Sequence, residues 1–153
     1  MAMRVARFTI LISVTLERKG TVLISVNSQE RAEAPAVAKI LYDNGFKILA
    51  TGKTCDTINE AGIPAENVNK LYEGRPNILD FIANDRIQLI INSPVGKDSI
   101  HDDSYLRKNA IKAKIPYITT IAAARAAAEG IRYLKNHGNG EICSLQERHA
   151  QIR

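Results

Sequence analysis

The sequence predicts an α/β fold built on a parallel sheet. Short apolar runs alternate with longer stretches of helical periodicity, which is the pattern of successive β-α-β units. Polar residues stand where the apolar runs end, as expected at strand-to-helix junctions. The 153 residues are 45% hydrophobic and 24% charged, which is typical of one globular domain that buries its own core.

The first half of the predicted core holds two strands, each followed by a helix. The run at 21–26 is apolar with few interruptions, which is typical of a buried parallel strand. Pro35 suits the first turn of the next helix, while Gly45 and Gly62 mark the two helix ends. The elements expected here are a strand over 21–26, a helix from about Pro35 to Asn44, a strand over 46–50 and a helix over 51–61.

The second half continues the alternation and contains the strongest strand signal. Residues 88–92 read Gln-Leu-Ile-Ile-Asn, a short apolar run that predicts a central strand. Asp102 or Asp103 is expected to cap the next helix, because a short carboxylate can accept from free backbone N–H groups. The elements expected here are strands over 68–71, 88–92, 116–119 and 142–145 and helices over 77–84, 102–113 and 122–134.

Residues 1–19 precede the predicted domain, which spans residues 20–153. Residues 9–14 nearly duplicate residues 21–26, and two interpretations stay open: an extra strand paired in a hairpin, and a leader or linker. The apolar stretch is shorter than the ~20 residues that a membrane-spanning helix needs. It is also followed by charged residues with no small-residue cleavage site. We therefore expect a cytoplasmic protein with no membrane partner.

Composition and charge favour a small anionic ligand. The net charge is +5, which favours anionic partners. Aromatic residues make up only 5% of the chain and Trp is absent, so base stacking on a nucleic acid is not expected. Cys55 and Cys143 lie far apart and have no histidine at metal-ligand spacing. We expect reduced thiols, no metal and no cofactor.

Hydroxyls, amides and lysines follow several of the predicted strands. Because the carboxyl ends of parallel strands meet at one edge of a sheet, these side chains are expected to converge near helix N-termini, where anions bind. Any single one is readily explained as a helix cap or a turn residue, but their combination favours a phosphate pocket. A P-loop is excluded, because Lys47 stands where that motif needs glycine before Gly52-Lys53-Thr54. The segments involved are 25–27, 51–54, 69–70, 92–94 and 119–120.

A set of motifs in fixed order resembles the methylglyoxal-synthase-like domain at the C-terminus of carbamoyl-phosphate synthase large subunits. The resemblance covers roughly residues 20–153, and Glu73-Gly74-Arg75-Pro76 and the tail His149-Ala150-Gln151-Ile152 carry the most weight. It implies a flavodoxin-like three-layer sandwich, with a central parallel sheet and helices on both of its faces. The other matching segments are 21–26, 45–54, 68–70 and 90–92.

The resemblance implies a regulatory role and no chemistry of the domain's own. Domains of this kind bind allosteric effectors, typically uridine monophosphate (UMP) as inhibitor and inosine monophosphate (IMP) as activator, and ornithine acts at the boundary with a neighbouring synthetase domain. The implied partners are the synthetase domains of the large subunit and, through them, the small glutaminase subunit. The implied context is carbamoyl phosphate synthesis for pyrimidine and arginine biosynthesis, a ligase reaction.

Site residues are implied position by position. Arg31 stands where many relatives have lysine, which keeps the charge but changes its geometry. Ser93-Pro94 replaces a common Thr-Thr pair, so one hydroxyl and one N–H are missing. Both Arg31 and Ser93 are expected at the effector. The other implied residues are Thr51, Thr54, Lys70 and Asn92 for the phosphate, Lys97 near the nucleotide, Asp102 at the pocket edge and Tyr117 facing the ornithine site.

The runner-up function is a true methylglyoxal synthase, a lyase that removes phosphate from dihydroxyacetone phosphate. That enzyme shares the fold and the threonine-rich phosphate site. Its Gly-Gly-Asp-Gln-Gln loop is expected where this chain has Glu73-Gly74-Arg75-Pro76-Asn77, and its second active-site aspartate falls at Pro94. Proline cannot act as a catalytic base, so the sequence favours a binding domain.

Overall fold

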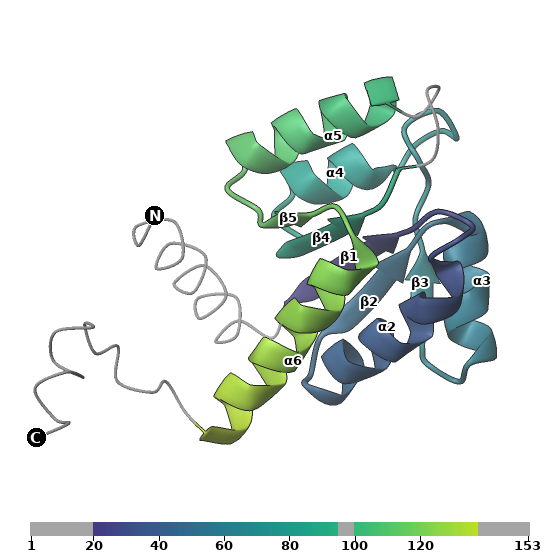
Figure 1. Cartoon of the computed structure of the whole chain (residues 1–153). Helices are drawn as coiled ribbons and strands as arrows, with labels where there is room; N and C mark the ends of the chain where they lie inside the picture. The colour runs from purple at the N-terminus through teal and green to yellow at the C-terminus, as the bar shows by residue number, and fades with distance from the viewer. Residues whose placement is uncertain (1–19, 95–99, 138–153) are drawn as a thin grey trace, which may run out of the picture.

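One parallel sheet forms the centre of the computed structural model, which describes residues 20–94 and 100–137. Within these residues, five strands pair in the order β3-β2-β1-β4-β5, and every pair is parallel (Figure 1). The extra strand considered at 9–14, the strand expected at 142–145 and Lys97 lie outside the described residues. The strands are β1 (Thr21–Ser25), β2 (Lys47–Ala50), β3 (Ala65–Asn67), β4 (Leu89–Asn92) and β5 (Tyr117–Ile118).

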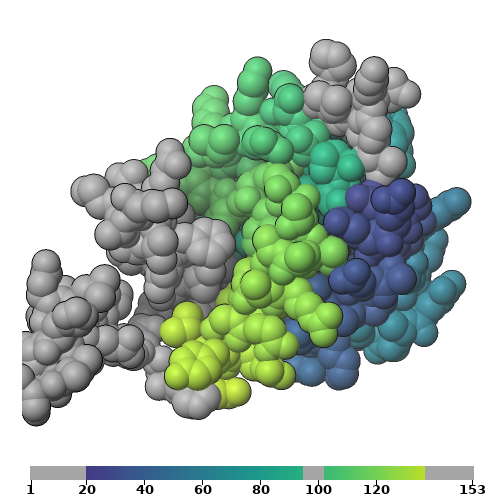
Figure 2. Space-filling view, in the orientation of Figure 1, coloured from purple at the N-terminus to yellow at the C-terminus, as the bar shows by residue number. Residues whose placement is uncertain are grey.

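Helices cover both faces of this sheet, so the three-layer α/β fold predicted from the sequence is confirmed for the described part of the chain. α2, α3 and α6 pack on one face, whereas α4 and α5 pack on the other. Figure 2 shows α6, in yellow-green, lying directly beside α2, in blue. The helices are a short 3-10 turn η1 (Arg31–Glu33), α2 (Ala34–Asp43), α3 (Gly52–Glu60), α4 (Ile78–Ala83), α5 (Ile100–Lys112) and α6 (Ile121–His137).

Two hydrophobic cores follow from the alternation of side chains along each strand. In β1, Val22 and Ile24 point into the core beneath α2, α3 and α6, while Leu23 points into the core beneath α4 and α5. All three side chains are fully buried. The run at 21–26 is therefore apolar throughout because a strand covered on both faces needs apolar residues at every position.

Two sequence-based expectations are corrected by the structure. The third strand is β3 at Ala65–Asn67, not 68–71, because its register with β2 pairs Ala50 with Asn67. Asp102 and Asp103 do not precede α5 as caps, because α5 begins earlier and both lie in its first turn. Carboxylates in a first turn still oppose the positive end of the helix dipole.

The strand order places a crevice next to β1. The chain runs from β1 outward through β2 to β3, then returns to the other side of β1 with β4 and β5. Ser25 and Asn92 are register partners at the carboxyl ends of β1 and β4. Ligands of open α/β sheets bind where the strand order reverses in this way, because the connecting loops diverge there.

Candidate functional site

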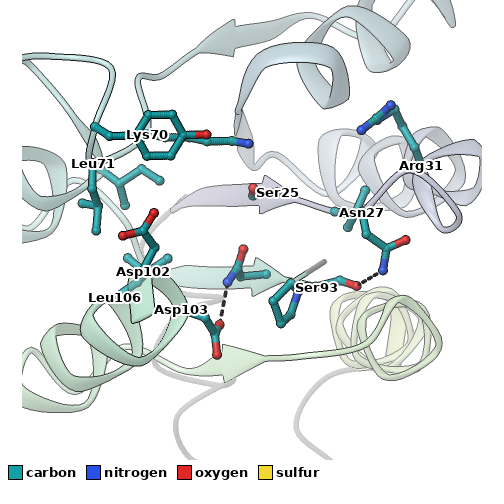
Figure 3. A pocket seen from close by; sticks show the side chains of 14 residues that line it. Ser25, Asn27, Arg31, Lys70, Leu71, Ser93, Asp102, Asp103 and Leu106 are labelled. Carbon is teal, nitrogen blue, oxygen red and sulfur yellow. Dashed lines mark hydrogen bonds between the residues drawn. The ribbon is translucent and has the colours of Figure 1, made fainter. Parts of the chain in front are cut away.

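A cavity of about 240 Å³ opens at the carboxyl ends of β1 and β4. Its walls come from the ends of both strands, from η1, from the loop that precedes α4 and from the first two turns of α5 (Figure 3). The structure brings five of the residues expected at the effector to this cavity, although they are widely spaced in sequence. They are Arg31, Lys70, Asn92, Ser93 and Asp102.

One side of the cavity is cationic. Figure 3 shows the charged ends of Arg31 and Lys70 extending toward each other from opposite sides above β1. Neither takes part in any ion pair among the described residues. The Nε atom of Arg31 is buried and has no hydrogen-bond partner in this part of the chain. The guanidinium group of Arg31 lines the cavity without an ion-pair partner among the described residues, which suits an anionic ligand.

Lys70 is held in place through its backbone. Its N–H donates to Glu73 Oε2 over 2.8 Å, and the Glu73 N–H donates to the Lys70 carbonyl over 3.1 Å. Glu73 caps the turn but forms no ion pair with the Lys70 ammonium group among the described residues. The ammonium group therefore stays available. The loop therefore fixes the base of the side chain and leaves its charge for the cavity.

The β4 side of the cavity rests on a hydrogen-bonded cluster. The Asn92 Nδ2 amide donates to Asp103 Oδ1 and to the Tyr117 hydroxyl, each over 2.7 Å. The Tyr117 hydroxyl donates to the same Asp103 oxygen over 2.5 Å. Arg107 donates to the other Asp103 oxygen over 3.1 Å and lies over the Tyr117 ring. Burial and the hydrogen bond to Asp103 raise the pKa of Tyr117 well above its usual range.

A second cluster supports Ser93 and includes Glu30, which the sequence did not single out. The Asn27 amide donates to Ser93 Oγ over 2.7 Å, and the Ser93 hydroxyl donates to Glu30 Oε2. Asn27 also accepts from the Glu30 N–H over 2.9 Å. The local Asn27–Glu30 turn has a recognisable spacing, but Glu30 and Ser93 are 63 positions apart. Only the fold brings them together.

Thr51 and Thr54 lie behind the cavity wall and are both 2% exposed. The Thr51 hydroxyl is 2.7 Å from the Ser25 hydroxyl, which lines the cavity. The Thr54 hydroxyl donates to the Val26 carbonyl over 3.3 Å and accepts from the Val26 N–H over 3.4 Å. Tyr117 likewise reaches the cavity through Asn92.

The described residues contain no group of three or more His, Cys, Asp or Glu side chains that could hold a metal ion. In the same part of the chain, no helix is long and apolar enough to cross a membrane. The cavity therefore offers a ligand two cations, Arg31 and Lys70, together with hydrogen-bonded polar groups and the carboxylates of Asp102 and Asp103.

Fold and cavity together define a parallel α/β domain with a candidate anion-binding pocket at its topological switch point. Residues 33–119 match the family model of the MGS-like domain, and the chain belongs to this family. That assignment confirms the family resemblance inferred from its motifs.

Similar curated proteins are carbamoyl phosphate synthase large chains. The chain is 53% identical over 116 residues to that of Acidobacterium capsulatum, covering 76% of this chain and 11% of the relative. It is 42% identical over 134 residues to that of Methanothrix thermoacetophila, covering 88% and 12%. It is 45% identical over 124 residues to the large chain, C-terminal section, of Methanopyrus kandleri, covering 80% and 23%. The chain thus spans between a tenth and a quarter of the length of these relatives.

Proposed function

We propose that the chain is an allosteric effector-binding domain that senses a nucleoside monophosphate, UMP or IMP. The proposal joins the family assignment to the cavity, whose cationic side is suited to a phosphate group. In it, Lys70 and Asn92 hold the phosphate together with Arg31, and Ser93 and Asp102 line the remainder of the effector site. Thr51 and Thr54 stand behind this site, next to Ser25 and Val26, and Lys97 is expected near the nucleotide.

The observation that carries the proposal is the pair of uncompensated cations. Arg31 and Lys70 face one cavity without a carboxylate partner among the described ion pairs. Two like charges facing each other repel, so an anion between them is favourable. Phosphate suits the pair because guanidinium and ammonium groups both make charge-assisted hydrogen bonds to its oxygens.

Isothermal titration calorimetry of the 153-residue chain with UMP and with IMP tests this proposal. Lys70→Ala is expected to weaken nucleotide binding by about tenfold or more, because one charge-assisted hydrogen bond is lost. Lys112→Ala, which removes an exposed charge from the last turn of α5, is the matched control and should change little. The proposal is wrong if neither nucleotide binds, or if the two variants behave alike.

The wider context is proposed from the relatives. We infer that the domain acts within a carbamoyl-phosphate synthase in the cytoplasm, beside the synthetase domains of the large subunit and the small glutaminase subunit. Ornithine is the proposed second effector, with Tyr117 facing its site, and the output is control of carbamoyl phosphate supply to pyrimidine and arginine biosynthesis. Assays of the complete enzyme with and without ornithine test this part: an ornithine response that is unchanged by Tyr117→Phe would contradict it.

A further inference from the structure

The β3 edge of the sheet carries backbone groups that point away from the sheet. Within the described residues, β3 pairs with β2 on one side only (Figure 1). The N–H of Val68, just after the strand, donates to the Ala50 carbonyl, so Val68 directs its backbone groups toward β2. Because these directions alternate along a strand, Ala65 and Asn67 direct their N–H and C=O groups outward. Such an edge is a template for pairing with another strand.

Asn59, in the last turn of α3, closes one of these outward positions. Its Oδ1 accepts from the Ala65 N–H over 2.9 Å, and its Nδ2 donates to the Ala65 carbonyl over 3.1 Å. A backbone N–H can only donate, so the amide oxygen must face it, which fixes the orientation of the Asn59 amide. The side chain therefore makes with Ala65 the pair of hydrogen bonds that a residue of an added antiparallel strand would make.

A second copy of the chain would present the same edge. Two identical edges related by a twofold axis run antiparallel and contact each other reciprocally. With the axis at Glu66, Ala65 of one copy faces Asn67 of the other, and these are the residues whose backbone groups point outward. Each of the two Ala65–Asn67 pairs would share two hydrogen bonds, and every one of these bonds uses the N–H or the carbonyl of Ala65. The Asn59 amide occupies both groups in each copy.

The other features of this edge oppose pairing only weakly. Glu66 and Asn67 are exposed and Ala65 is half-buried, so solvent and a second copy can reach the strand. Pairing of two copies would place Glu66 opposite Glu66, and like charges directly opposite each other destabilise a strand pair. Lys47 offsets that charge, because its Nζ lies 2.6 Å from Glu66 Oε2. The main obstacle to pairing is therefore the Asn59 amide.

We propose that Asn59 guards the β3 edge and keeps a second copy of the chain from adding to the sheet there. The contact between Asn59 and Ala65 lies within one chain, so it carries no cost of bringing two molecules together. A second copy must displace this contact before it can pair. The inference is independent of the proposed nucleotide site, because neither Asn59 nor Ala65 lines that cavity.

Sedimentation velocity of the 153-residue chain, over a series of concentrations up to about 1 mM, tests the guard because dimers of millimolar Kd become populated there. Asn59→Ala removes both hydrogen bonds and keeps α3, since alanine is a strong helix former. This variant is expected to dimerise with a Kd about tenfold or more below that of wild type, the effect of freeing backbone groups for hydrogen bonds between copies. Glu60→Ala, an exposed change next to it in α3, is the matched control and should behave as wild type. Equal concentration dependence of wild type and Asn59→Ala overturns the inference.

Hydrogen exchange at the Ala65 amide locates the association. In dilute Asn59→Ala this amide has lost its acceptor and should exchange about tenfold faster than in wild type, and a second copy should restore its protection at high concentration. Glu66→Gln removes the like charge but keeps the Asn59 contact, so it should behave as wild type in both measurements. If Glu66→Gln dimerises while Asn59→Ala does not, charge guards the edge and the inference is wrong. Dimerisation of Asn59→Ala without protection of Ala65 places the contact elsewhere and also contradicts it.

Discussion

At the scale of single residues, the surroundings of Tyr117 strongly alter its acidity. Burial, and then the hydrogen bond to Asp103, disfavour its phenolate and raise the pKa of Tyr117. The tyrosines at 42, 72, 105 and 133 are all exposed. We expect a titration followed by tyrosinate absorbance to show one late phase, which Tyr117→Phe removes. Tyr105→Phe, an exposed change on α5, should remove amplitude from the main phase instead.

The same shift makes stability depend on pH in a defined direction. Because the folded pKa of Tyr117 lies above its unfolded value of about 10, the neutral form contributes stability fully below that pH. That contribution is lost as pH rises from there through the folded pKa. Chemical unfolding at rising alkaline pH should therefore show a steeper loss of stability in wild type than in Tyr117→Phe. Parallel curves for the two proteins would contradict this account.

The site residues show how far single positions can be predicted from the sequence. Lys70 and Asn92 lie at the carboxyl ends of predicted strands, and parallel strands bring these ends to one edge of the sheet, so their meeting at one cavity was predictable. The part that Glu30 plays in the site was not predictable, because its contact with Ser93 joins distant segments and depends on side-chain orientation. The orientation of the Asn92 amide depends on Asp103 and Tyr117 in the same way.

At the scale of elements, α4 depends on its first residue. It has only six residues, so intrinsic helix formation is weak and its cap matters. Asn77 accepts from the Leu79 N–H over 3.0 Å, and Asp80 accepts from the Asn77 N–H over 2.9 Å. Ile78 then belongs to both the core and the cavity wall.

Asn77→Ala is expected to lower the free energy of unfolding by about 1 kcal/mol, the usual value of an N-cap side chain. Asn77→Ser keeps an oxygen at the cap and should retain most of the stability. Urea unfolding monitored by circular dichroism measures both. If the serine variant loses as much stability as the alanine variant, the effect comes from packing of the 7% exposed Asn77 rather than from capping.

Strand β3 shows why the sequence predicts the position of one strand wrongly and the positions of its neighbours correctly. β1, β2 and β4 are apolar because helices cover both of their faces, and this pattern is visible in the sequence. β3 lies at the edge of the sheet, and its Glu66 and Asn67 are exposed. Val68 just beyond it is buried and its N–H still bonds to the Ala50 carbonyl. The apolar signal therefore lies after the strand, which shifted the prediction toward 68–71.

At the scale of the whole molecule, the cavity joins both helical layers to the sheet. Arg31 comes from the segment that leads into α2 on one face, whereas Asp103 comes from α5 on the other. Lys70 lies on the loop between β3 and α4. None of these neighbours is close in sequence, so an unfolded chain cannot reproduce the site. A ligand held there binds only the folded state and stabilises it as a unit.

UMP at about 100 times its dissociation constant should therefore raise the free energy of unfolding by about 2.7 kcal/mol. Because the proposed anchor is a pair of half-buried cations, the gain should shrink as salt is added and the charges are screened. Uridine, which lacks the phosphate, is the matched ligand control and should stabilise the chain far less at the same concentration. Urea unfolding with UMP and with uridine, each at low and at high sodium chloride, measures the four combinations of ligand and salt. Equal stabilisation by uridine and UMP would place the binding energy in the nucleoside, and the cationic side of the cavity would then have no part in recognition.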